Sequence, residues 1–127
     1  MTANPISASR EDYVEAIYQL AGRDRGVRAT DIARRLNVRR ASVTGALRTL
    51  AGLGLVHYTP YRAVTLTPAG RTLGRQVSRR HAAIREFFEK VLGVAPAKAD
   101  AAACRVEHCL DADILERLAD LAARGRN

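Results

Sequence analysis

The sequence predicts a mainly α-helical protein, with a winged helix-turn-helix over residues 1–70 and a helical domain over residues 71–127. In the first part, helical apolar patterns are followed by two strand-like segments, which is the element order of a winged helix-turn-helix. In the second part, the apolar patterns have helical spacing. The 127 residues and their 47% hydrophobic content are enough for a compact core, but not for two large independent ones.

Three short helical patterns make up the predicted helix-turn-helix. Ser9 is expected to cap the first helix, with Asp12 as its capping-box partner, and an apolar stripe at helical spacing follows. A second helix is expected over Thr30–Leu36 and a third over Arg40–Leu50, joined by a short turn. Because the third helix of such a unit enters the major groove, the polar face of Arg40–Leu50 is the predicted recognition surface.

Two strands and three helices are predicted for the rest of the chain. Val56–Tyr58 and Ala63–Leu66 alternate in polarity as the strands of a hairpin, with Thr59–Arg62 at its tip. This hairpin is the predicted wing. Thr67 followed by Pro68 is typical of a helix start, and a long helix is expected to run to Val91. The remaining helices are expected over residues 99–110 and 111–124.

The charge of the chain is high and unevenly distributed. Lys and Arg number 21 against 13 Asp and Glu, which gives a net charge of +8. Residues 23–48 contain eight Arg and two Asp, whereas residues 100–127 contain six acidic residues and four Arg. A basic region confined to the predicted helix-turn-helix indicates a polyanionic partner, with nucleic acid ahead of a membrane surface.

The predicted DNA contacts lie on the third helix, at the tip of the wing, and in the segments that precede the second and third helices. We expect Arg39 or Arg40 to contact base edges and the remaining arginines to hold phosphates. The full set of expected contacts with a double-stranded DNA operator is Arg25, Arg28, Arg39, Arg40, Ser42, Thr44, Arg48 and Arg62.

A second group of residues points to metal binding. Cys104, Glu107 and His108 stand at positions i, i+3 and i+4, so one helix would place all three side chains on the same face. A thiolate, a carboxylate and an imidazole together suit a divalent transition metal. Cys109 lies off that face, and the spacing of the two cysteines on one helix argues against a disulfide between them.

Several short motifs occur together with these features. They are Glu11–Tyr18, Thr30–Ala33, Ser42–Thr44, Gly54–Val56, Leu66–Gly70, Arg80-His81 and Glu107-His108. In these motifs the chain resembles the DtxR/MntR family, the metal-dependent regulators of the diphtheria toxin repressor and manganese transport regulator type. The combination of the first-helix motif with Arg-His and Cys-x-x-Glu-His is the specific part of the resemblance.

The resemblance implies a set of metal ligands, namely Asp12, Glu15, His81, Cys104, Glu107 and His108. Asp12 and Glu15 match the manganese branch of the family, whereas Cys104 matches the iron branch. The longer iron regulators have an ancillary metal site, and its ligand pattern is not kept. Arg85 stands where they have a carboxylate, and Asp100 stands where they have a histidine.

The implied function is a metal-activated, DNA-binding transcriptional repressor that controls metal homeostasis as a homodimer. Mn²⁺ or Fe²⁺ is the expected cofactor, and Co²⁺ or Zn²⁺ could substitute in vitro. An alternative keeps the winged helix but makes Cys104 a redox sensor. A metallohydrolase is disfavoured because six ligands would leave no open coordination position. No small-molecule substrate or membrane is expected, and the lack of a signal peptide or spanning segment predicts a cytoplasmic protein.

Overall fold

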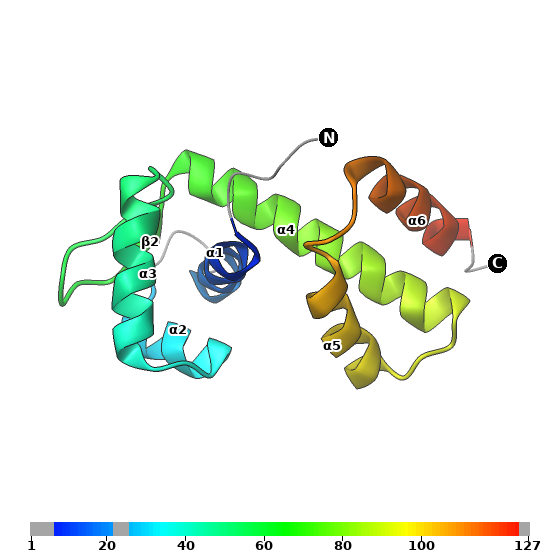
Figure 1. The fold of residues 1–127 in the computed structure, drawn as a ribbon, viewed down its shortest axis with the longest axis horizontal. Helices are drawn as coiled ribbons and strands as arrows, with labels where there is room; N and C mark the ends of the chain where they lie inside the picture. Colours follow the sequence, from blue (N-terminus) through cyan, green and yellow to red (C-terminus); the bar gives the residue numbers. More distant parts are fainter. Residues whose placement is uncertain (1–6, 22–25, 125–127) are drawn as a thin grey trace. The chain divides into compact units, whose positions relative to one another are not determined.

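The computed structural model describes residues 7–21 and 26–124 (Figure 1). Its elements are α1 (Ala8–Ala21), α2 (Ala29–Leu36), α3 (Arg40–Gly52), β1 (Val56–His57), β2 (Thr65–Leu66), α4 (Pro68–Glu86), the π-helical turn η1 (Phe87–Val91), α5 (Pro96–Val106) and α6 (Ala112–Arg124). The chain divides into two compact units, residues 1–76 and 77–127, and α4 contributes to both. None of the helices in the described ranges has the length and apolar character needed to span a bilayer.

The first unit is a winged helix-turn-helix, as predicted. Its core is built from apolar side chains of α1, α2 and α3, with Ile17, Ile32 and Leu47 completely buried. The antiparallel strands β1 and β2 pair Val56 with Leu66, and their loop extends outward beside α3 (Figure 1). Burial in this core raises the pKa of the Tyr13 phenol above its usual 10.0.

The turn of the helix-turn-helix depends on one left-handed residue. Asn37 ends α2 with φ of 55° and ψ of 50°, a conformation that Asn tolerates better than most residues. The backbone N–H of Val38 then donates to the carbonyl of Ala33, which closes the helix end. Arg39 occupies the N-cap of α3 and makes no side-chain capping bond, so α3 begins without the usual cap.

The first helix begins earlier than the sequence predicts. The Oγ atom of Ser7 accepts a hydrogen bond from the backbone N–H of Arg10 at 3.3 Å, so Ser7 is the N-cap and Ser9 lies inside α1. The predicted capping box of Ser9 and Asp12 is therefore wrong. One carboxylate could not fully serve both as the capping partner of Ser9 and as a metal ligand. Without the capping box, metal ligation by Asp12 has no competing role at Ser9.

The start of α4 agrees with the prediction and requires a glycine. Oγ1 of Thr67 accepts a hydrogen bond from the N–H of Gly70 at 3.0 Å, so Thr67 is the N-cap. A Cβ atom on Gly70 would lie 1.9 Å from the carbonyl oxygen of Leu55, so only glycine fits where α4 crosses this backbone.

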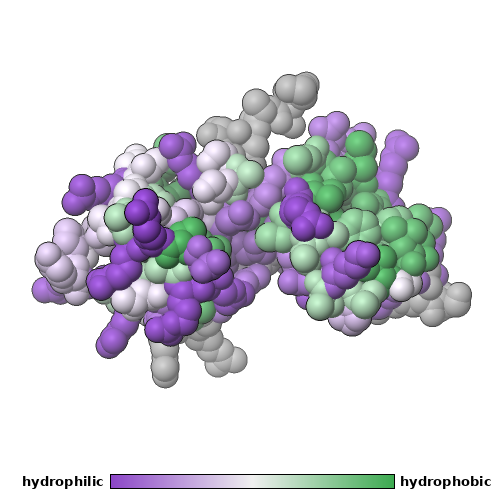
Figure 2. Space-filling view, turned by 60° about the horizontal axis from the view of Figure 1, so that its bottom comes forward, coloured by the Kyte–Doolittle hydropathy of each residue, from purple (hydrophilic) through white to green (hydrophobic). Residues whose placement is uncertain are grey.

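The second unit is formed by the end of α4, η1, α5 and α6. Its small core is centred on Ile84, Ala103 and Leu115, and both α5 and α6 contact η1. The long helix predicted to reach Val91 becomes π-helical from residue 87, and the helix predicted over residues 99–110 spans Pro96–Val106 instead. Hydrophobic residues also gather on the surface of this unit (Figure 2). The large exposed ones are Val91, Leu92, Ile114 and Leu121.

Candidate metal centre and nucleic-acid interface

Three potential metal ligands converge within the second unit. His81 comes from α4, Cys104 from α5 and Glu107 from the C-cap of α5. One ligand atom from each residue lies within 4.8 Å of the others. One imidazole, one thiol and one carboxylate make a mixed donor set of the kind that divalent transition metals accept.

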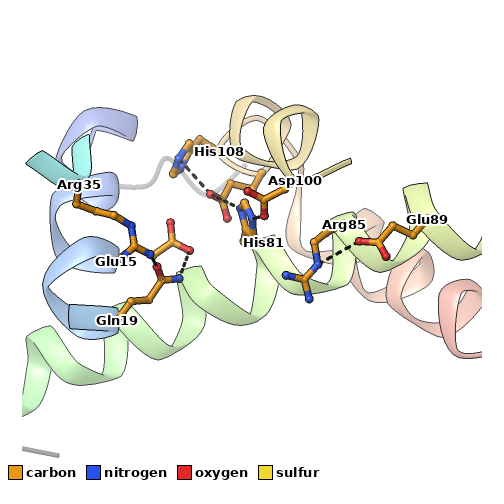
Figure 3. A network of polar contacts seen from close by, with 9 residues as sticks. Glu15, Gln19, Arg35, His81, Arg85, Glu89, Asp100 and His108 are labelled. Atoms are coloured by element: carbon orange, nitrogen blue, oxygen red, sulfur yellow. Dashed lines mark hydrogen bonds and ion pairs between the residues drawn. The ribbon is translucent and has the colours of Figure 1, made fainter. Parts of the chain in front are cut away.

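Glu107 is the central residue of this group. It is 1% exposed, and its Oε1 lies 3.5 Å from Nδ1 of His81 and 3.6 Å from Nε2 of His108 (Figure 3). Neither carboxylate oxygen accepts a hydrogen bond from any residue that the structure describes. Buried polar atoms normally have hydrogen-bond partners, so a buried carboxylate in this state fits a position that a cation occupies.

The end of α5 sets this geometry. The helix ends at Val106, and Glu107 keeps helical angles of φ −58° and ψ −30° while its N–H donates to Ala103. Cys104 and Glu107 therefore retain the predicted spacing of three residues on one helical face. His108 does not continue that helix, because the chain turns at residues 107–109. The single-helix arrangement predicted for the three residues is wrong in this respect, although His108 still faces Glu107.

Cys104 is exposed at the edge of the group, and neither it nor Cys109 forms a disulfide. An accessible thiol beside a buried carboxylate can act as a metal ligand or react with an oxidant. The geometry within the second unit is compatible with the first role, because Cys104 lies with His81 and Glu107.

The two carboxylates predicted on the first helix belong to the first unit. Asp12 and Glu15 are three residues apart on α1, so their side chains share one face of the helix. Glu15 is only 8% exposed, and its Oε2 accepts a hydrogen bond from Nε2 of Gln19 at 3.3 Å. Gln19 in turn accepts a hydrogen bond from Arg35 of α2 (Figure 3). A polar chain thus connects Glu15 with the second helix of the helix-turn-helix.

Asp100 is a residue whose place in the site the sequence reasoning missed. Its Oδ1 lies 2.7 Å from Nε2 of His81, whereas Arg85 pairs with Glu89 at 3.5 Å (Figure 3). From the sequence, Asp100 is expected only to mark a departure from the ancillary metal site of the iron regulators. Its spacing of four residues from Cys104 on one helix was the available signal that it belongs beside the same group.

Five of the eight predicted DNA contacts line a groove between α3 and the wing. The groove has a volume of about 640 Å³. It is lined by Arg28, Ala29, Thr30, Arg40, Thr44, Arg48, Tyr58, Pro60, Tyr61, Arg62 and Ala63. Arg39 at the N-cap of α3 and Ser42 on α3 are exposed outside this lining, and Arg25 lies outside the described residues.

Two residues of this surface have specific local geometry. The hydroxyl of Thr44 donates to the carbonyl of Arg40 at 3.1 Å, and the residue is only half-exposed. Tyr61 at the wing tip is fully exposed and has a φ of 66°. A left-handed conformation is unfavourable for a bulky residue and is often found at functional sites. An aromatic ring held outward between Pro60 and Arg62 suits contact with a nucleic acid.

Comparison with known proteins gives a consistent result over both units. Residues 6–64 match the family described as iron dependent repressor, N-terminal DNA binding domain. Residues 67–124 match iron dependent repressor, metal binding and dimerisation domain. The chain is 37% identical over 114 residues to an uncharacterised HTH-type transcriptional regulator of Methanocaldococcus jannaschii, a match that covers 89% of this chain and 91% of that one. It is 35% identical over 113 residues to the HTH-type transcriptional regulator MntR of Lysinibacillus sphaericus, covering 89% and 81% of the two chains.

Two solved structures of similar fold belong to longer proteins. A manganese-dependent transcriptional repressor in complex with manganese has a TM-score of 0.82 and 26% identity, over 90% of this chain and 52% of that one. The manganese regulator SloR has a TM-score of 0.79 and 27% identity, over 97% and 55% of the respective chains. The present chain therefore spans about half the length of these solved chains.

Proposed function

Because the chain belongs to the DtxR/MntR family of metal-dependent transcriptional regulators, we propose that it is a repressor that binds operator DNA as a homodimer when a divalent metal is bound. The observation that carries the metal part of this proposal is Glu107. A fully buried carboxylate that accepts no hydrogen bond from the described residues has a cation as its natural partner.

The proposed ligands come from both units. His81, Cys104, Glu107 and His108 form the group in the second unit. By correspondence with the first-helix motif of the family, we add Asp12 and Glu15 of α1 as ligands. When bound, the metal supplies a positive charge that attracts these side chains. Joint ligation by α1 and the second unit would restrict how the two units move relative to each other.

We propose that metal binding affects DNA binding by limiting the movement of α1. Helix α1 packs against α2 and α3 in the same core, so a constraint on α1 also constrains the recognition helix. In a two-fold dimer, the orientation of each recognition helix sets the spacing of the half-sites that can be bound. Coupling of this kind is reciprocal, so operator DNA should strengthen metal binding by the factor by which metal strengthens DNA binding.

For the metal itself we propose Mn²⁺ or Fe²⁺ as the physiological ion. The hard oxygen ligands Asp12, Glu15 and Glu107 suit both ions, and the thiol of Cys104 shifts the preference toward Fe²⁺, Co²⁺ or Zn²⁺. Along the Irving–Williams order, Co²⁺ and Zn²⁺ should bind tightly in vitro whichever ion acts in the cell.

The exposed apolar residues of the second unit support a homodimer. Val91, Leu92, Ile114 and Leu121 are large hydrophobic residues at 38–58% exposure, and this unit matches a dimerisation domain. The basic first unit remains available for DNA. Since its partner is genomic DNA, we place the protein in the cytoplasm.

The test is DNA binding to the protein's own promoter region, measured with chelator and with each of Mn²⁺, Fe²⁺, Co²⁺ and Zn²⁺ under anaerobic conditions. We expect at least one ion to increase the affinity, in line with allosteric coupling factors of about 5 to 150. Equal affinity of the chelated and metal-loaded protein would refute the proposal. Release of DNA by peroxide from metal-free protein would instead support thiol sensing at Cys104.

A further inference from the structure

The two ring nitrogens of His81 face two different carboxylates. Nε2 lies 2.7 Å from Oδ1 of Asp100, which is a hydrogen-bond distance. Nδ1 lies 3.5 Å from Oε1 of Glu107, which is one of the proposed metal ligands. His81 itself is mostly buried, with 14% of its side chain exposed, so the ring has a defined environment on both sides.

The Asp100 contact determines where the imidazole holds its proton. An ionised carboxylate can only accept hydrogen bonds, so Nε2 must be the donor in this pair. In the neutral ring, Nδ1 is then unprotonated and presents its lone pair on the side of Glu107. We propose that Asp100 is a positioning residue that fixes His81 in this tautomer and orientation, so that Nδ1 is the atom available to a divalent metal.

The placement of Asp100 supports this role over direct ligation. Asp100 and Cys104 lie one turn apart on α5, and Asp100 contacts the ring nitrogen that points away from Glu107. Its side chain is 57% exposed, whereas that of Glu107 is fully buried. Metal-binding histidines commonly donate their second N–H to a carboxylate, which orients the ring.

Asp100 and Arg85 both differ from the residues that the resembled iron regulators have at these positions. Those regulators have a histidine ligand of an ancillary site where this chain has Asp100, and a carboxylate where it has Arg85. Here Arg85 pairs with Glu89, and Asp100 pairs with His81. Asp100, at a position that belongs to the ancillary metal site in those regulators, therefore supports His81, a proposed ligand of the main metal site. This role of Asp100 rests on the proposed metal-dependent function.

The first test needs no metal. Long-range ¹H–¹⁵N NMR of the imidazoles distinguishes the two neutral tautomers in chelated protein at a pH where the ring is neutral. We expect His81 to carry its proton on Nε2 in the wild type and to lose this preference in Asp100→Ala. An unchanged tautomer in Asp100→Ala would overturn the proposal, even if the protein bound metal well.

The second test is metal affinity, measured by calorimetry with Co²⁺ for the wild type, Asp100→Ala and Asp100→Asn. We expect Asp100→Ala to weaken binding by about 10- to 100-fold, the usual effect of losing such a partner. Asp120→Ala removes an exposed carboxylate from α6 and should bind Co²⁺ like the wild type.

Asp100→Asn separates positioning from ligation. Its amide oxygen can still accept a hydrogen bond from Nε2. If NMR shows that His81 keeps its proton on Nε2 in this variant, Co²⁺ should bind about as tightly as to the wild type, and if the proton is lost from Nε2, Co²⁺ should bind as weakly as to Asp100→Ala. If Asp100→Asn keeps the Nε2 proton but binds Co²⁺ as weakly as Asp100→Ala, Asp100 is a ligand and the proposal is wrong. If the wild type binds no metal, the proposed function fails. The NMR result still decides whether Asp100 fixes the tautomer of His81.

Discussion

Oε1 of Glu107 lies 3.5 Å from Nδ1 of His81, and the Glu107 carboxylate is fully buried. A buried charge is unfavourable for folding unless a partner of opposite charge compensates it. In the metal-free protein this arrangement should therefore reduce stability, and in the metal-bound protein it should be favourable. Functional sites commonly lower the stability of the folded protein in this way.

The first prediction follows from this trade-off. Glu107→Gln should leave the metal-free protein as stable as the wild type or more stable, because it removes a buried charge. It should also abolish the stabilisation that metal produces in the wild type, about 2.7 kcal/mol when the metal is at 100 times its Kd. Thermal unfolding with chelator and with Co²⁺ measures both effects.

A matched control is Glu116→Gln, which changes an exposed carboxylate on α6. This variant should keep the full metal response. A Glu107→Gln protein that is still stabilised by metal like the wild type would show that Glu107 is not a ligand.

The sequence predicted the fold well where the apolar periodicity is strong. The helix-turn-helix, the wing and the Thr67 cap follow from local rules, and the structure contains them. The errors lie at helix ends. Ser7 caps α1 in place of Ser9, and α5 ends at Val106. Several neighbouring residues could form each helix end, and tertiary packing selects one of them.

The candidate site could be predicted only in part. The spacing of Cys104 and Glu107 survives because Glu107 keeps helical angles at the end of α5. The contact between His81 and Asp100 joins residues 19 positions apart on different helices. No local pattern encodes such a pair, and only the packing of α4 and α5 within the second unit brings the two side chains together.

The second prediction concerns recognition of DNA. Arg40 is exposed at the start of α3 and lines the groove beside the wing, so Arg40→Ala should reduce discrimination between operator and unrelated DNA. A lost base contact is expected to cost about 1–3 kcal/mol at that position. Arg62→Ala at the wing should instead weaken binding to all sequences and reduce the salt slope by about 1.

Fluorescence anisotropy with operator and scrambled duplexes over a salt series measures these effects. Arg117→Ala removes an exposed arginine from α6 and serves as the control for net charge. If Arg39→Ala and Arg40→Ala both leave the sequence preference unchanged, α3 is not the recognition helix.

The third prediction uses two glycines of the first unit with opposite environments. Gly70→Ala would place a Cβ atom 1.9 Å from the Leu55 carbonyl oxygen and should destabilise the fold by roughly 1–3 kcal/mol. Gly45 is exposed within α3, and a Cβ atom added to it would meet no other atom within 4 Å. Gly45→Ala should therefore stabilise the fold by about 0.5–1 kcal/mol, because it favours the helix.

Urea unfolding of the two variants in chelator gives these free energies without a contribution from metal. An equal effect of the two substitutions would contradict the close approach of α4 to the Leu55 backbone.

The last prediction concerns the identity of the metal. Cys104 lies with His81 and Glu107, and its sulfur is the soft member of an otherwise hard or borderline donor set. Cys104→Glu replaces the thiol with a carboxylate and recreates the ligand pattern expected for the manganese branch. Carboxylates favour Mn²⁺ relative to Co²⁺, so the substitution should lower the Mn²⁺ concentration needed for half-maximal DNA binding relative to that of Co²⁺. Anaerobic titrations of the wild type and the variant measure this ratio. Cys109→Ser alters the neighbouring exposed thiol and should leave the ratio unchanged. If Cys104→Glu also leaves it unchanged, the Cys104 sulfur does not contact the metal, and the preference for Mn²⁺ or Fe²⁺ must come from the carboxylates and histidines alone.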